Sequence, residues 1–171
     1  AIRRQRQMCI RDRCWLPDLK YSDAAAAERY SSAPDYFEKA VPAIEQMFRQ
    51  TGPYEIGADG ILKKGVLIRH LILPGQMKNT KGVLEYVAET FRKGDVLFSL
   101  MRQYTPHGRA EEFPEINRRI TDEEYEEAEA YMEALGIEDG YIQQKESSDQ
   151  GFIPVFDGTG VERAAERNTK K

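Results

Sequence analysis

The segment GVLIRHLILPG, residues 65–75, constrains the fold more than any other part of the sequence. It is a continuous apolar run that begins at glycine, ends in Pro-Gly and is interrupted only by Arg69 and His70. A strand that is apolar on both faces is typical of a parallel sheet whose two faces are both covered. The run is also far shorter than the roughly 20 apolar residues that a membrane crossing needs. We therefore predict a buried parallel strand here.

Strand-like and helix-like segments alternate on both sides of this strand. We expect strands at 14–21, 65–75, 95–101 and 141–143, and helices at 22–31, 34–50, 79–93 and 121–135. Such alternation predicts parallel strands joined by helical crossovers. Four strands are too few to close an eight-stranded barrel. The predicted fold class is α/β, as an open sheet or a partial barrel.

Several residues mark where these helices begin and end. Pro34 suits a first helical turn and Gly52 suits a helix end, whereas Pro42 predicts a kink or a later start. Thr121 and Glu124 have the spacing of a capping box. We interpret the acidic residues that follow Thr121 as a solvated helix face, and we predict no metal site there.

Composition and charge exclude several classes of function. The 171 residues have a net charge of -4, and the first thirteen hold five arginines against one aspartate, so the rest is strongly acidic. An acidic body argues against nucleic acid as the partner, and the short apolar runs argue against a membrane partner. Cys9 and Cys14 alone make neither a zinc knuckle nor a disulfide framework. A reducing, cytoplasmic setting is expected.

Both ends of the chain are expected to lie outside the fold. Residues 1–13, AIRRQRQMCIRDR, have no hydrophobic period and resemble translated sequencing-adapter read-through, with a native basic tail as the alternative. Such segments are left out of reasoning about the fold. We expect the domain to cover residues 14–161, with a flexible tail at 162–171.

Candidate site residues follow from the rule that chemistry in parallel α/β folds gathers at the carboxyl ends of strands. Asp18 and Lys20 share one face of an extended segment and can grip a zwitterion such as an amino acid, or they form a salt bridge at the strand end. Arg69 inside an apolar strand needs a partner. It either holds a ligand carboxylate in bidentate fashion or pairs with Asp18 or another carboxylate.

Other polar residues near strand ends are given weaker interpretations. His70 points to the opposite face from Arg69, so we interpret it as a packing histidine. Tyr104 and His107 follow the strand at 95–101 and receive no role. Asp157 lies in FDGTG, a turn whose glycine pattern does not match a phosphate-binding loop. The sequence contains no Walker loop, no G-x-S-x-G, no H-E-x-x-H and no G-x-G-x-x-G.

Seven short strings, taken in their order along the chain, show a resemblance to one family. These are WLPDLKY, YSSAPDYF, AIEQMFRQTG, DGILKKG, LIRHLILPG, SLMRQYTP and IPVFDGTGV. Together they resemble the C-terminal half of radical S-adenosylmethionine proteins related to pyruvate formate-lyase activating enzyme. The resemblance covers roughly residues 15–161, and the ordered combination is more specific than any single string.

The resemblance implies a fold, a chemistry and partners. The fold would be a partial (β/α)6 TIM-type barrel, of which this chain holds the C-terminal half. The family cleaves S-adenosylmethionine reductively at a [4Fe-4S] cluster and makes a 5′-deoxyadenosyl radical for hydrogen abstraction. In activating enzymes a glycyl radical enzyme is the protein substrate, and an electron donor is also required. By position, Asp18, Lys20 and Arg69 would bind S-adenosylmethionine.

The sequence also departs from the family. The cluster loop C-x3-C-x2-C is absent, and Cys9 and Cys14 do not replace it. We therefore expect a truncated chain whose front half is missing and which is inactive by itself. Two alternatives stay open: a non-catalytic α/β module that binds a ligand, and a Schiff-base aldolase with Lys20 as the nucleophile.

Overall fold

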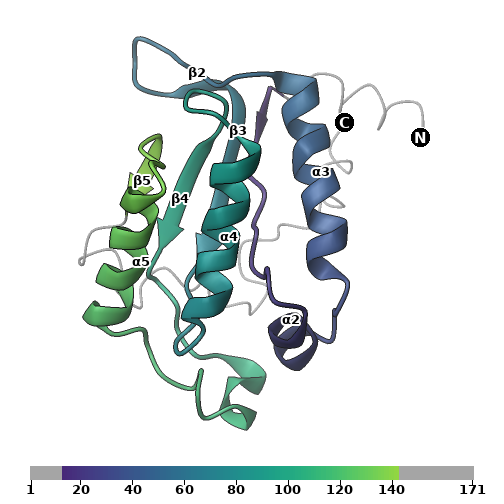
Figure 1. Ribbon diagram of the computed structural model, residues 1–171, viewed down its shortest axis with the longest axis vertical. Coiled ribbons are helices and arrows are strands. Elements are labelled where there is room, and N and C mark those ends of the chain that lie inside the picture. Colours follow the sequence, from purple (N-terminus) through teal and green to yellow (C-terminus); the bar gives the residue numbers. More distant parts are fainter. Residues whose placement is uncertain (1–12, 143–171) are drawn as a thin grey trace, which may run out of the picture.

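The computed structural model describes residues 13–142 (Figure 1). The predictions for the two tails, for Cys9 and for the Asp157 turn lie outside the described residues. In chain order the elements are β1 (Cys14–Trp15), α2 (Ala24–Ser31), α3 (Tyr36–Thr51), β2 (Glu55–Ile56), β3 (Leu62–Leu71), α4 (Met77–Thr90), β4 (Leu97–Met101), the 3-10 helix η1 (Gly108–Glu112), α5 (Asp122–Ala134) and β5 (Gly140–Ile142).

The strands form a five-stranded mixed sheet in the order β1-β3-β4-β5, with β2 paired to β3. The pairs β1–β3, β3–β4 and β4–β5 are parallel, which confirms the predicted α/β class and the parallel crossovers. The pair β2–β3 is antiparallel. This short hairpin lies in residues 53–64, where none of the predicted strands was placed.

One face of the sheet is covered by helices and holds the core. In β3, the side chains of Val66, Ile68 and His70 are 0% exposed, whereas Leu67 and Arg69 on the other face are only half-buried. Figure 1 shows α3, α4 and α5 side by side on one side of the strands. The core therefore forms between these helices and the sheet face that carries Ile68 and His70.

Helix boundaries follow the capping chemistry more closely than the proline positions. Thr121 and Glu124 form the predicted capping box at the start of α5, with both reciprocal bonds present. Gly52 ends α3 at a φ of 69°, as predicted. Pro34 lies before α3 and not in its first turn, so that prediction was wrong. Pro42 lies inside α3, which continues to Thr51.

Gly65 is required where the chain enters the parallel part of β3. Its φ is 123°, a region that side chains with a Cβ rarely adopt. A Cβ built there would lie 2.6 Å from both Cα and Cβ of Tyr54. The residue before the hairpin therefore packs directly on the glycine, which explains why the apolar run is bounded by glycine at this end.

Across residues 13–142, none of the helices is both long enough and apolar enough to span a membrane.

Candidate functional site

The candidate site lies on the sheet face opposite the described helices. Asp18 pairs with Arg69 across an isolated parallel bridge, and Arg69 pairs in register with Ser99 of β4. Residues in register across neighbouring strands point to the same face, so these three side chains form a polar row across the sheet. The surrounding residues of that face, such as Leu67 and Leu71, are apolar. Polar chemistry on this face is thus concentrated in one row.

The sheet brings Asp18 and Arg69 into an ion pair. A terminal nitrogen of Arg69 lies 2.8 Å from Oδ1 of Asp18, and the two side chains are 39% and 40% exposed. The backbone is fixed on both sides of the pair, because Leu19 donates to the carbonyl of Arg69 at 2.9 Å and Arg69 donates to the carbonyl of Pro17 at 2.9 Å. Of the two interpretations open for Arg69, pairing with Asp18 is therefore present in the structure.

The Arg69 guanidinium still has unused hydrogen-bonding capacity. Its Nε is buried and has no partner among the described residues. An orphaned buried donor carries a desolvation cost unless a further group accepts from it. An acceptor placed over the Asp18–Arg69 pair would remove that cost.

Lys20 lies two residues after Asp18, and both are exposed. Leu19, which lies between them, and Tyr21, which follows Lys20, are buried. This alternation places Asp18 and Lys20 on the same side of the chain, as predicted. The carbonyl of Lys20 accepts from Nδ2 of Asn79 at 2.8 Å, which leaves the side chain as the free part of the residue. An anion and two cations are thus presented within one short stretch of surface.

Four residues hold the backbone of this stretch in place; we refer to Tyr36, His70, Asn79 and Thr80 as the clamp. Nδ1 of His70 lies 2.7 Å from the carbonyl of Leu19, and Nε2 lies 3.1 Å from Oγ1 of Thr80. A carbonyl can only accept, so Nδ1 carries the proton and Nε2 accepts from the Thr80 hydroxyl. Burial lowers the pKa of His70 to about 4, which keeps the ring neutral. The prediction that His70 is a packing histidine is confirmed.

Asn79 and Tyr36 complete the clamp. The Oδ1 atom of Asn79 accepts from the backbone of Ser22 at 2.8 Å and of Asp23 at 3.1 Å. The hydroxyl of Tyr36 donates to the carbonyl of Asp18 at 2.7 Å and accepts from the backbone of Lys20 at 3.0 Å. Burial raises the pKa of the Tyr36 phenol, so it stays protonated and able to donate. Neither role was predicted, because the partners of Tyr36 and Asn79 are distant in the chain.

Tyr104 and His107, which received no role from the sequence, lie away from the ion pair. They line a separate cavity of about 370 Å³ together with Tyr21, at the carboxyl end of the strands. Burial raises the pKa of the Tyr104 phenol.

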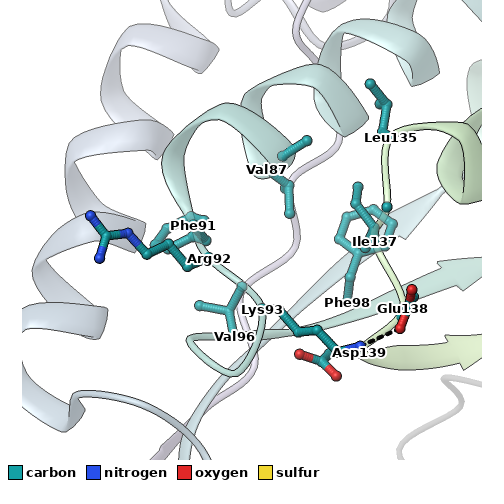
Figure 2. Close-up of a pocket in the computed structure, with 12 residues that line it drawn as sticks. Val87, Phe91, Arg92, Lys93, Val96, Phe98, Leu135, Ile137, Glu138 and Asp139 are labelled. Carbon is teal, nitrogen blue, oxygen red and sulfur yellow. Dashed lines mark hydrogen bonds and ion pairs between the residues drawn. The ribbon is translucent and has the colours of Figure 1, made fainter.

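Figure 2 shows another cavity, of about 300 Å³, at the opposite end of the sheet. Its walls are mainly core side chains such as Val87, Phe91 and Phe98, and Lys93 pairs with Glu138 at its mouth. It lies where β4 begins, at the amino ends of the parallel strands, where residues serve stability rather than chemistry in such folds. We assign it to packing between α4, the segment after α5 and the sheet.

The donor set fits an amino-acid ligand and does not fit an iron–sulfur cluster. Asp18 can accept from an ammonium group, while Lys20 and Arg69 can donate to a carboxylate. Within the described part of the chain, no three His, Cys, Asp or Glu side chains gather closely enough to hold a metal ion. Cys14 is half-buried and its thiol donates to the carbonyl of Leu62 at 3.5 Å, so it is engaged in the sheet.

Comparisons with known proteins leave the function open. No family model matches the chain, and no solved structure matches it. The chain is similar to an uncharacterized protein of Methanocaldococcus jannaschii, with 28% identity over 127 residues that cover 72% of this chain and 32% of the relative. The chain therefore spans about a third of the length of that curated relative. Since the relative is itself uncharacterized, it brings no function to this chain.

Proposed function

We propose that this chain is part of a radical S-adenosylmethionine protein related to pyruvate formate-lyase activating enzyme, and that Asp18, Lys20 and Arg69 hold the amino-acid end of S-adenosylmethionine. The observation that carries the proposal is the Asp18–Arg69 pair beside Lys20 at the carboxyl end of parallel strands. Ligands in open parallel sheets bind at this end. The family resemblance assigns the same three positions.

The charges of the site match a zwitterion. The ammonium of an amino acid would lie against Asp18, and its carboxylate would accept from Lys20 and from the exposed part of the Arg69 guanidinium. Both partners of the ion pair are about 40% exposed, so a ligand can reach them. The clamp keeps the backbone of residues 18–23 fixed. Little conformational entropy is therefore lost when the ligand binds.

The proposed architecture is a partial (β/α)6 barrel, with the sheet face opposite the described helices as part of its interior. Two features support it. All described helices that pack on the sheet lie on one face (Figure 1). Parallel sheets are normally covered on both faces, and Leu16, in the segment that runs alongside β3, is 51% exposed. In the proposed barrel this face would turn toward the interior, with the polar row at its centre.

The chemistry of the family requires a [4Fe-4S] cluster that supplies the electron for cleavage of S-adenosylmethionine. The residues of this chain do not form a cluster loop, since the sequence holds only Cys9 and Cys14. We therefore assign no step of the cleavage to these residues, only the binding and orientation of the cofactor. A glycyl radical enzyme as protein substrate, an electron donor and a cytoplasmic location are parts of the same proposal.

The two alternatives gain different support from the site. A ligand-binding module without turnover would use the same charged surface, so binding data alone do not separate it from the proposal. An aldolase needs a lysine that is activated by burial in an apolar pocket. Lys20 is exposed, which does not favour a nucleophilic role.

Calorimetry with two matched ligands tests the binding role. S-Adenosylmethionine should bind, and 5′-methylthioadenosine, which lacks the amino-acid end, should bind more weakly. Lys20→Gln and Asp18→Asn should remove most of that difference, whereas the control Lys64→Gln, which removes a lysine near the start of β3, should preserve it. Equal binding of both ligands, or no heat with millimolar S-adenosylmethionine, would contradict the proposed binding site.

Gene sequence tests the family assignment and separates it from the non-catalytic alternative. The DNA upstream of codon 15 should encode C-x3-C-x2-C in frame. Anaerobically reconstituted full-length protein should then release 5′-deoxyadenosine when reduced in the presence of S-adenosylmethionine. A natural start codon just before Trp15 with no cysteine triad would refute the assignment.

A further inference from the structure

The cavity lined by Tyr104 and His107 has the position of a ligand site. It lies outside the ends of three neighbouring strand segments, because Tyr21 follows the segment after β1, Leu73 follows β3 and Tyr104 follows β4. Tyr30 of α2 and Arg109 of η1 also line it, and these two elements lie at the end of the molecule toward which the arrow of β4 points in Figure 1. Crevices at the carboxyl ends of parallel strands are where such folds bind small molecules. Its volume of about 370 Å³ suits a molecule of one or two rings.

The walls of this cavity are aromatic and held rigidly. The rings of Tyr30 and Phe113 meet edge to face at 5.3 Å between centroids. The Arg29 guanidinium lies 5.1 Å from the Phe113 ring and binds Glu115, whose carboxylate also accepts from the Tyr30 hydroxyl at 3.0 Å. On the other side, the Tyr21 hydroxyl lies 2.9 Å from that of Ser31. Aromatic walls fixed in this way favour a planar ring that stacks between them.

The charged residues around the cavity determine which sign of ligand charge is favoured. Arg109 and His107 line it, and no described residue that lines it is Asp or Glu. The Arg109 charge is shared with Glu112 at 2.9 Å in an exposed i,i+3 pair, which a ligand anion can displace at little cost. A cationic ligand would be repelled by Arg109, and the carboxylate at this rim, Glu112, is already engaged by that arginine. An anionic substituent at the rim is therefore favoured over a cationic one.

The Tyr104 phenol adds a neutral donor inside. Burial raises its pKa, so it remains protonated at neutral pH, and it has no hydrogen-bond partner among the described residues. The cavity also shares a wall with the Asp18 site, since Tyr21 packs edge-on against Tyr36 at 5.4 Å and Tyr36 donates to the Asp18 carbonyl. A ligand here would thus lie next to the proposed cofactor site and not inside it.

We propose that this cavity binds a small aromatic carboxylate. Its ring would lie between the Tyr30–Phe113 pair and Tyr104, and its carboxylate would lie at Arg109. The proposal goes beyond the assignment of S-adenosylmethionine and does not rest on it, because no residue of the cavity belongs to the trio Asp18, Lys20 and Arg69.

Three probes test the charge of the ligand and the planarity of its ring on the full chain. Indole-3-acetate should bind. Tryptamine, which carries an ammonium group in place of the carboxylate, should bind at least about fivefold more weakly. Cyclohexylacetate, which lacks a planar ring, should also bind more weakly than indole-3-acetate. Ligand-observed saturation-transfer NMR and calorimetry measure these affinities. Equal binding of tryptamine and indole-3-acetate, or no binding of indole-3-acetate at millimolar concentration, would overturn the proposal.

Variants locate the binding. Arg109→Gln should weaken the binding of indole-3-acetate by about fivefold. The protein should stay folded, because the Arg109 side chain is 74% exposed. Arg109→Lys should recover part of the lost affinity. Phe113→Leu should weaken the binding of both indole-3-acetate and cyclohexylacetate. The control Arg92→Gln changes an arginine at the cavity of Figure 2, at the other end of the sheet, and should have no effect. Sensitivity to Arg92→Gln, or insensitivity to both Arg109→Gln and Phe113→Leu, would place the ligand elsewhere and refute the inference.

Discussion

Acidification should destabilise this fold through His70 before it affects the surface carboxylates. The ring is 0% exposed and its pKa is about 4 in the folded state, against an ordinary value of 6.5. Below pH 6.5 the unfolded chain therefore binds more protons than the folded chain, so the free energy of unfolding falls as the pH falls. From these two values the loss between pH 7 and pH 5 is about 2 kcal/mol, with a slope that approaches about 1.4 kcal/mol per pH unit.

Urea titrations at several pH values, followed by fluorescence, measure this loss. Trp15 is the single tryptophan and packs against the core, so its emission reports unfolding. His70→Gln removes the titrating group; it should lower stability at pH 7 by about 1–3 kcal/mol through poorer hydrogen bonds, and it should flatten the slope between pH 7 and 5. Parallel slopes for the two proteins would refute the reasoning.

Surface carboxylates do not interfere in that window. Hydrogen bonds from Arg118 lower the pKa of Glu124 to about 2, and those from Arg29 lower the pKa of Glu115 to about 2. A carboxyl with a depressed pKa stabilises the fold above its unfolded value and loses that contribution as the pH falls toward its folded pKa. Their effect therefore begins near pH 4.5 and lies below the range in which His70 is tested.

Three substitutions test other parts of the structure, each by urea denaturation. Thr121→Ala removes the capping box of α5 and should cost about 1 kcal/mol; no loss would mean that the cap is not formed in solution. Gly65→Ala forces a Cβ against Tyr54 at positive φ and should cost about 2 kcal/mol or more, so a neutral result would contradict the close approach. Asp18→Asn should change stability by less than about 1 kcal/mol, because its pair with Arg69 is exposed, and a larger loss would show that the pair is structural.

Most helices and the long strands could be predicted because their signals are local. The apolar run at 65–75 corresponds to the strand β3, and the capping box at Thr121 begins α5. The β2–β3 hairpin was missed although a signal was present: Asp59-Gly60 is a turn dipeptide between Ile56 and Ile61. The two residues of β2 are exposed, so they show no hydrophobic period that a strand prediction can use.

The site was predictable only in part, because its geometry depends on pairing between distant strands. Asp18, Lys20 and Arg69 stand out as charges near strand ends, and pairing of Asp18 with Arg69 was one of the two interpretations considered. The roles of Asn79 and Tyr36 follow from contacts with residues 16 to 59 positions away, which no local pattern encodes. A polar residue in the first turn of a helix after a buried strand is the signal that could have pointed to Asn79.

The Asp18–Arg69 pair is better explained by a ligand than by the stability of the sheet. Backbone hydrogen bonds on both sides of the pair, from Leu19 and to Pro17, already fix the register without the side chains. His70 and Asn79 hold the following residues from the opposite face. An exposed ion pair contributes at most about 1 kcal/mol, and it occupies an otherwise apolar face where aliphatic side chains would pack at lower cost. A sheet built only for stability would lack the polar row and a buried Arg69 Nε that has no partner within residues 13–142. Both features support the proposal that this face holds a zwitterion.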